Sequence, residues 1–137
     1  MALESQGTVI SVGTTDSPSA YHAIGSITTF SGPGGSASVI DVTTLASTAK
    51  QKMMGLPDEG QITLEVLFDP TDTNGQVALR TARAARTLQY FKIAFYDSPT
   101  HTAKFTGYVL GFQINGSVDN AVKCSITVEI DGAVTWA

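Results

Sequence analysis

The sequence has 137 residues, which is the size of one domain with its own hydrophobic core. Charged residues make up only 15% of it, well below the roughly 25% of an average globular chain, so we expect a partner to cover part of the surface. The formal net charge is −4, from eight basic and twelve acidic residues. This balance leaves little positive charge for a duplex-binding surface and argues against a nucleic-acid-binding domain.

The N-terminal sequence MALESQGTVIS has neither a basic segment nor an apolar core, so we expect no signal peptide. No apolar run approaches the ~18 residues of a membrane-spanning helix, and we expect no membrane partner. The single cysteine, Cys124, excludes an internal disulfide. It lies in the alternating segment VKCSITVEI, which predicts a buried, reduced thiol on the core face of a strand; a reactive thiol is the alternative.

Alternation of apolar and polar residues predicts β-strands along most of the chain. In chain order, the predicted strands span residues 7–12, 22–30, 62–69, 89–96, 103–114, 122–130 and 133–136. The turn-forming pairs Asn115-Gly116 and Asp131-Gly132 are expected to end two of them. The pattern predicts a mainly β protein, an antiparallel sandwich or barrel.

The alternation fails over residues 31–59, where we expect a long irregular loop with one short strand-like piece, SVIDV. Loops of this length are uncommon in compact domains unless they work on a partner. The adjacent Met53 and Met54 have long, adaptable side chains that suit a surface repacking against another chain. The alternative is that the pair packs back on its own sheet.

A helical period replaces the alternation in TNGQVALRTARAARTL, which predicts one α-helix over about residues 75–88. The face expected to lie on the sheet contains Val77, Thr81, Ala84 and Leu88. The opposite arc contains Leu79, Arg80, Arg83 and Arg86. This arc is either a solvated face or a contact between subunits, in which Leu79 would be covered.

No group of residues predicts catalysis, a cofactor or a metal site. His22 and His101 each stand far from a second histidine or a cysteine, and the sequence lacks a G-x-S-x-G nucleophile elbow. Trp136 is expected as a final core residue, with an interface role as the alternative. The predicted strands place Glu65 and Asp69, and also Glu129, opposite their apolar faces. The alternative is an ordinary antiparallel sheet with one solvent-exposed face, which gives the same pattern.

Three segments add a more specific signal: IDVTTL at 40–45, GLPDEG at 55–60, and the run from SVDN to IDG at 117–132. With the order of the other elements, they make nearly the whole chain resemble the major tail tube proteins of long-tailed, non-contractile bacteriophages. The resemblance implies a β-sandwich with one helix, in a single domain over residues 1–137. It also implies a structural virion protein with no enzymatic activity, assembled in the bacterial host cytoplasm into the virion tail.

The resemblance further implies stacked hexameric rings that form a hollow tube, a conduit for DNA ejection. Its partners would be a tape-measure protein, tail-tip and tail-terminator proteins, and double-stranded DNA in transit. The inter-subunit segments would be an N-terminal arm, 1–20, and the loop 31–59. The loop contact residues would be Ile40, Asp41, Leu45, Met53, Met54 and Leu56. The lumen-facing residues would be Glu65, Asp69 and Glu129, whose carboxylates offer passing phosphates no attraction.

Two other functions fit parts of this pattern. A tube subunit of a contractile tail or a secretion apparatus would share the ring geometry. An immunoglobulin-like surface binding module would share the sandwich, but we would expect aromatic residues in its binding loops, and residues 31–59 contain no Trp or Tyr.

Overall fold

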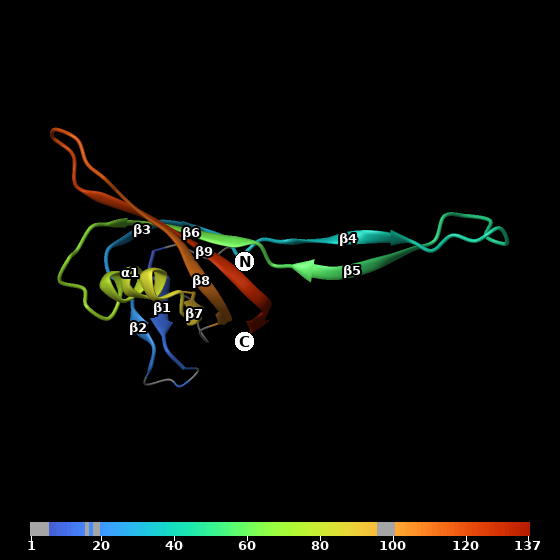
Figure 1. The fold of residues 1–137 in the computed structure, drawn as a ribbon, viewed down its shortest axis with the longest axis horizontal. Helices are drawn as coiled ribbons and strands as arrows, with labels where there is room; N and C mark the ends of the chain where they lie inside the picture. The colour runs from blue at the N-terminus through green and yellow to red at the C-terminus, as the bar shows by residue number, and fades with distance from the viewer. Residues whose placement is uncertain (1–5, 16, 18–19, 96–100) are drawn as a thin grey trace.

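The computed structural model describes residues 6–15, 17, 20–95 and 101–137, and it has two parts, a β-rich body and a long projecting hairpin (Figure 1). The elements in chain order are β1 (Val9–Gly13), β2 (His22–Ala23), β3 (Ile27–Ser31), β4 (Ser36–Asp41), β5 (Lys52–Asp58), β6 (Gln61–Leu67), α1 (Gln76–Ala85), β7 (Gln89–Ala94), β8 (Thr102–Asn115) and β9 (Lys123–Trp136).

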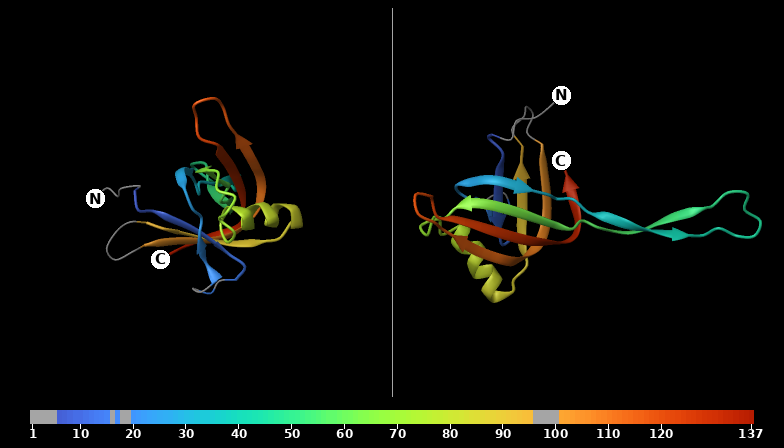
Figure 2. Two further views of the ribbon diagram at one scale, coloured as in Figure 1. Left: turned by 90° about the vertical axis from the view of Figure 1, so that its left-hand side faces the viewer. Right: turned by 90° about the horizontal axis from the view of Figure 1, so that it is seen from above.

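Seven strands form one antiparallel sheet in the order β2-β1-β7-β8-β9-β6-β3, and β4 and β5 form a separate two-stranded sheet. The large sheet is strongly curled, so that β1 and β7 cross the layer of β3, β6 and β9 at a steep angle (Figure 2). The predicted fold class, mainly β with one helix, is therefore confirmed. The two ends of the large sheet, β2 and β3, do not pair with each other, which leaves a half-barrel.

The core fills the concave side of this curled sheet. It is built from alternate residues of β1, β6, β7, β8 and β9, and α1 adds Leu79 and Ala82. The Phe91 and Phe105 rings stack at its centre with their centroids 5.4 Å apart. Cys124 is fully buried on the core face of β9, as predicted, and burial raises the pKa of its thiol.

The predicted facing of the helix is wrong, because Leu79 is buried and Thr81 and Ala84 are exposed. A polar network at the start of α1 sets the facing instead. The side-chain amide of Gln76, only 1% exposed, donates to the carbonyls of Gly25 and Leu67 at 3.0 and 2.9 Å and accepts from the Asp69 N–H at 2.9 Å. Asp72 Oδ2 accepts from the N–H groups of Gly25 and Gln76.

The turn prediction at Asn115-Gly116 is confirmed, because β8 ends there, but the one at Asp131-Gly132 is wrong. β9 continues through the second pair as a bulge, opposite Lys104 and Thr106 of β8. Gly132 adopts a φ of 81°, which a glycine accepts without strain, so the pair bends the strand without ending it.

The loop expected over 31–59 is irregular only in part. Its strand-like piece SVIDV falls largely on β4, and β5 pairs with β4 to form a hairpin that the sequence did not predict. It leaves the body where Gly34 and Gly60 form a β-bridge. A Cβ on Gly35 would collide with the Asp58 carbonyl, so the two strands approach closely at the base of the hairpin.

The chain ends also differ from expectation. Residues 9–13 of the predicted N-terminal arm are strand β1, paired with β7 and β2, and Ile10 and Val12 are buried in the core. Residues 1–5, 16 and 18–19 of that arm lie outside the described residues. Trp136 is 64% exposed, so its expected core position is wrong. Within the described ranges, no helix has the length and apolarity that crossing a membrane requires.

Candidate assembly interface

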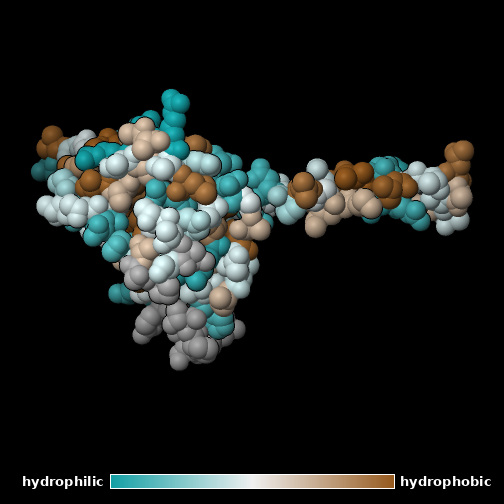
Figure 3. Space-filling view, turned by 60° about the horizontal axis from the view of Figure 1, so that its bottom comes forward, coloured by the Kyte–Doolittle hydropathy of each residue, from teal (hydrophilic) through white to brown (hydrophobic). Residues whose placement is uncertain are grey.

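The hairpin β4–β5 carries a continuous set of exposed apolar side chains on a segment that projects away from the body. They are Val39, Ile40, Val42, Leu45, Met53, Met54 and Leu56. Figure 3 shows hydrophobic surface along the projection. A lone two-stranded hairpin is marginally stable in water at best, and exposed apolar surface of this kind marks a contact site. The predicted loop residues therefore come together on one element.

The register of the hairpin distributes these side chains over two faces. Val39 pairs with Met54, and Ile40 pairs with Met53. Residues paired directly across an antiparallel ladder share a face, and consecutive residues of a strand point to opposite faces. One apolar pair therefore lies on each face of the ribbon. Asp41 pairs with Lys52 and joins the face of Val39 and Met54.

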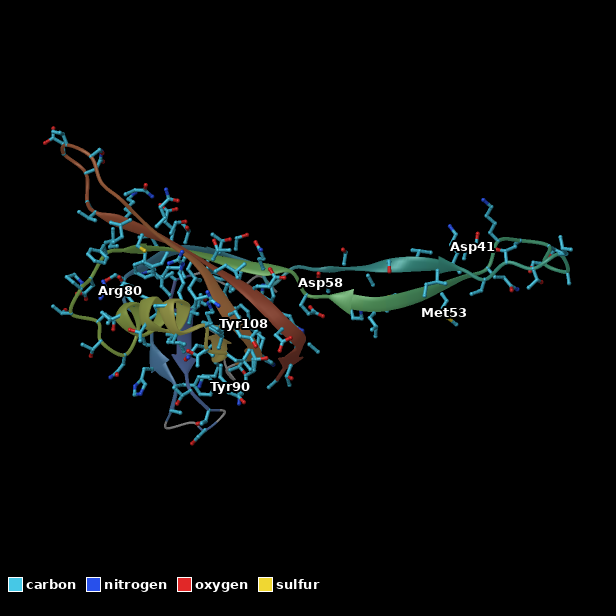
Figure 4. All side chains as sticks on the ribbon, in the orientation of Figure 1. Asp41, Met53, Asp58, Arg80, Tyr90 and Tyr108 are labelled. Carbon is cyan, nitrogen blue, oxygen red and sulfur yellow. The ribbon has the colours of Figure 1, made fainter. Side chains whose placement is uncertain are left out.

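The far end of the hairpin is held by polar contacts. Asp41 Oδ1 accepts from the Thr43 N–H at 2.9 Å, and the Gln51 N–H donates to Thr43 Oγ1 at 2.8 Å. The hydrogen bonds from Thr43 lower the pKa of the Asp41 carboxyl. Leu45 stands fully exposed beyond these contacts. Asp41 and Met53 lie well along the projection, and Asp58 lies at its base (Figure 4).

The predicted helix interface does not form one surface. Leu79 is buried in the core and cannot contact another subunit. Arg83 is exposed, and its Nε donates to the Leu110 carbonyl of β8 at 3.0 Å, which ties the helix to the sheet. Arg86 ends the helix in the left-handed region, with a φ of 58°. Among the predicted set, Arg80 and Arg86 remain as exposed side chains for a partner.

The convex face of the sheet carries the predicted acidic residues Glu65 and Glu129 on the adjacent strands β6 and β9. Glu65 pairs with Ser125, and Glu129 pairs with Gln61. Hydroxyl side chains separate the two carboxylates along the same face, and Thr29 Oγ1 of β3 contacts Glu65 Oε2 at 3.5 Å. The result is a hydroxyl-rich surface with two carboxylates, and the pair of Leu67 and Lys123 lies on the same face next to Glu65.

Asp69 does not share this face, so that part of the prediction is wrong. β6 ends at Leu67, and Asp69 lies in the connection to α1. Its Oδ1 accepts from the N–H and the hydroxyl of Thr71 at 3.0 and 2.6 Å, and these bonds lower the pKa of its carboxyl. Asp69 therefore shapes a turn.

Strand β3 forms one open edge of the large sheet, next to the acidic convex face. It pairs with β6 on one side and with no other strand of the described chain. The N–H and C=O groups on its other side are a template for pairing with a further strand. The hairpin β4–β5 follows β3 directly along the chain, so the open edge and the projecting surface are adjacent.

A second exposed apolar group lies at the free end of the β8–β9 hairpin, which sequence reasoning noticed only in part. Its members are Ile114, Val118 and Val122. Ile114 is the last residue of the predicted strand 103–114. Val122 begins the predicted strand 122–130, where alternation placed it on the core face, but it is 46% exposed and precedes β9. Val118 lies in the turn, where an isolated apolar residue has no period to mark it.

These surfaces fit what sequence comparison finds. The profile of the family described as "Phage tail tube, TTP, lambda-like" matches residues 1–137. The chain belongs to this phage tail tube family. It is accordingly a structural tail tube subunit and a virion component. A search of curated protein sequences finds no match.

Solved tail structures share the fold of this tail tube protein. The tail of an empty GTA particle, solved with C6 symmetry, is 16% identical with a TM-score of 0.78, and the match covers 99% of both chains. The SPP1 tail tube is 13% identical with a TM-score of 0.74, and the match covers 98% of this chain and 78% of that one.

The fold extends to contractile systems as well. A chain in the sheath/tube terminator structure of an extracellular contractile injection system, PVC, is 15% identical with a TM-score of 0.76, covering 100% of this chain and 97% of that one. The fold therefore does not separate contractile from non-contractile systems, and the family match decides for the phage tail tube. In the described part of the chain, no three His, Cys, Asp or Glu side chains lie together as a metal site would need.

Proposed function

We propose that six copies of this protein close into a ring and that the rings stack into the hollow tail tube through which the phage ejects its DNA. The exposed apolar hairpin carries this proposal, because its apolar side chains are left uncovered by the part of the chain that the structure describes. The six-fold symmetry of the similar GTA tail supports the ring number.

The open edge at β3 gives the ring contact a physical basis. A head-to-tail contact that closes makes a ring, and one that does not close makes a filament, so a tube requires both. Pairing the β3 edge with a neighbour would remove the exposed backbone groups and join the sheets around the ring. The hairpin, which follows β3 in the chain, would then make the contact between rings.

The acidic convex face next to β3 is proposed to line the channel. Glu65 and Glu129 would present carboxylates to passing DNA, and carboxylates gain nothing from phosphate contact. Before ejection the channel would hold a tape-measure protein, and tail-tip and tail-terminator proteins would close its ends. Assembly would take place in the host cytoplasm.

Negative-stain electron microscopy of the purified, concentrated protein tests the proposal. We expect hollow tubes of uniform width, formed spontaneously or on addition of tail-tip complexes. A protein that stays monomeric at high concentration, with and without tail tips, would overturn it. A variant that carries Val39→Ser and Met54→Ser tests the role of the hairpin. These substitutions remove apolar surface outside the core, so they should suppress tube formation without unfolding the body.

A further inference from the structure

The bulge in β9 opens a cleft on the face of the sheet that points away from the core. Lys104 and Thr106 of β8 pair with Thr135 and Asp131 of β9, so three residues of β9 lie opposite one residue of β8. The three include a glycine and an alanine, whose small side chains leave a hollow of about 380 Å³. The volume of this hollow, which we call the bulge cleft, is in the range of roughly 300–1,000 Å³ found for small-molecule sites.

Two tyrosines form the walls of the bulge cleft. Tyr90 is on β7, and Tyr21 directly precedes β2. Both are partly buried, and the Lys92 ammonium lies 4.9 Å from the centroid of the Tyr21 ring, a cation–π contact that helps to hold the ring in place. Figure 4 shows Tyr90 on the body, well away from the projecting hairpin. A tyrosine presents a large, rigid apolar surface with a polar tip, so these walls suit a ligand ring that has an apolar face.

Polar groups of both charges complete the lining of the bulge cleft. Lys104 supplies an ammonium group, Asp131 a carboxylate, and Thr135 a hydroxyl. The Thr106 hydroxyl donates to the Asp131 carbonyl at 3.0 Å, which fixes the backbone of the bulge beside the Asp131 side chain. A few polar groups that converge on an aromatic-walled hollow are the ordinary composition of a ligand site. The cleft therefore offers both donors and acceptors to a bound molecule.

A saccharide is the ligand class that matches this lining. A sugar ring has an apolar face of C–H groups, which can stack on tyrosine, and a rim of hydroxyls that both donate and accept hydrogen bonds. The charge favours an acidic sugar, because Lys92 and Lys104 are paired across the ladder and lie on the same face. Like charges placed directly opposite each other are destabilising, and an anion between them relieves this. A uronic acid supplies such an anion, whereas two lysines are too few for a nucleic-acid duplex.

The tyrosine wall of the bulge cleft belongs to the layer that faces away from the acidic face of β6. The core is packed between β1 and β7 on one side and β6 and β9 on the other, so the outer faces of the two layers point in opposite directions (Figure 2). The bulge is the corner at which β9 turns from one layer towards the other. With Glu65 on the proposed channel wall, Tyr90 is on the outside of the tube.

We propose that the bulge cleft binds an acidic saccharide unit and that the tail tube displays this site on its outer wall. The binding half of the proposal stands on the cleft of the single subunit, and the display half rests on the proposed function. Repetition of the site in every copy along the tube would turn a weak affinity for one sugar unit into avidity for a polymer. The chemical class of the ligand is a polysaccharide that carries uronic acids.

Titration of the free subunit tests the binding half. Dilute, isotope-labelled protein is titrated in the NMR tube with tetramannuronate and with mannotetraose of the same linkage, which carries a hydroxymethyl group in place of each carboxylate. We expect the amide signals of Gly132 and Ala133 to shift, with an affinity for tetramannuronate about fivefold higher than for the neutral probe, and salt should reduce this preference. Tetragalacturonate is the second acidic probe. If neither acidic probe moves these signals, or if mannotetraose binds equally well, the proposal is wrong.

Two substitutions locate the site. Tyr90→Ala removes one aromatic wall and should weaken tetramannuronate binding at least about tenfold, as truncation of a tyrosine at the centre of a contact commonly does. Lys104→Gln keeps the length of the side chain and should remove the preference for the acidic probe. Tyr108→Ala is the control, because Tyr108 lies on the same face of β8 but outside the cleft lining.

The fold of each variant is checked by circular dichroism. A folded Tyr90→Ala subunit that binds tetramannuronate normally would overturn the proposal. If Tyr90→Ala does not fold, Lys104→Gln decides, and an unchanged preference for the acidic probe in that variant would overturn the proposal.

Co-sedimentation separates the display half from the tube function. Assembled tubes are pelleted with fluorescent polymannuronate, and we expect the polymer in the pellet with wild-type tubes and less of it with Lys104→Gln tubes. Binding by free subunits but not by intact tubes would show that the cleft is covered in the tube, which overturns the display half. Absence of any tube would refute the proposed function and the display half with it, while the titration still decides whether the cleft binds an acidic saccharide.

Discussion

Gln76 shows at the residue scale how one buried polar side chain orients an element. Its amide bonds the Gly25 and Leu67 carbonyls and the Asp69 N–H, which come from two separate stretches of the chain, and it is almost completely buried. Leu79 and Ala82, which follow at intervals of three residues, then face the core. The orientation of α1 is thus fixed by hydrogen bonding at its first residue. The small residues around the helix allow this orientation but do not select it.

Replacing Gln76 by alanine should strongly destabilise the subunit. The substitution leaves the Gly25 and Leu67 carbonyls and the Asp69 N–H without this partner. Each buried group left unpaired costs about 1–3 kcal/mol, so we expect a loss of roughly 3 kcal/mol or more in the free energy of unfolding. Urea unfolding followed by circular dichroism measures it. Gln113→Ala, at an exposed position of β8, is the control, and equal urea midpoints for both variants would contradict the role of Gln76.

The same residues show what sequence reasoning could reach. Alternation correctly predicted the core position of Cys124, because a two-residue period needs no knowledge of the neighbours. The facing of α1 was mispredicted because glutamine is usually solvent-exposed unless its partners are known. Gln76 reaches Gly25, 51 residues away, together with Leu67 at the end of β6 and Asp69 in the connection before the helix. Trp136 was expected as a final core residue of the last strand, yet it is exposed at the end of β9.

Asp69 gives the subunit a pH dependence whose sign follows from its pKa. Hydrogen bonds from Thr71 lower the folded-state pKa of this carboxyl below its unfolded value. Its contribution to stability is therefore complete above the ordinary aspartate pKa of about 3.9 and is lost as the pH falls through the folded pKa. We expect Thr71→Val to raise the Asp69 pKa, measured by NMR titration of the side-chain carboxyl. An unchanged Asp69 pKa would remove the hydroxyl as its cause.

At the scale of the element, the hairpin β4–β5 explains why residues 31–59 looked irregular. A strand with apolar residues on both faces has no alternation, so Val39-Ile40 and Met53-Met54 erase the signal that marks the other strands. The need for a partner was still predictable, from apolar residues in a long segment between strands. Its regular pairing was not, because consecutive apolar residues suit a ribbon only when both faces are covered.

Charge placed on either face of the hairpin should block assembly while the subunit stays folded. Met53→Lys and Met54→Lys each put an ammonium group on an apolar pair that is exposed in the free chain and covered in the proposed tube. Burying an unpaired charge costs several kcal/mol, so we expect each variant to lose tubes in sedimentation and electron microscopy, with an unfolding midpoint close to wild type. Met53→Leu and Met54→Leu conserve volume and should still assemble. Normal tubes from either lysine variant would show that its face remains in water.

At the scale of the whole molecule, the large sheet keeps its two faces for different tasks. The concave face holds the core and α1, and the convex face carries hydroxyl and carboxylate side chains across β3, β6 and β9, with the Leu67–Lys123 pair at one end. The open β3 edge, the start of the hairpin and the carboxylates of Glu65 and Glu129 lie on consecutive or paired strands. An edge contact that closes a ring would therefore bring the acidic faces of neighbouring copies into register around one channel.

That arrangement makes DNA release depend on the charge of the convex face. In phage carrying Glu65→Lys and Glu129→Lys, each copy gains a charge of +4 on the proposed channel wall, since each substitution exchanges −1 for +1. Lysines that contact phosphates release counterions and bind, so we expect otherwise normal tails to eject DNA more slowly. Ejection kinetics from purified virions, triggered at two salt concentrations, measure this, and higher salt should partly restore the rate because it screens the attraction. The control is Asp119→Lys, a change of +2 per copy in the turn between β8 and β9, compared with Glu65→Lys alone, which is the same change on the convex face. If these two single substitutions slow ejection equally, or if the Glu65 and Glu129 pair does not slow it, then the convex face does not face the passing DNA.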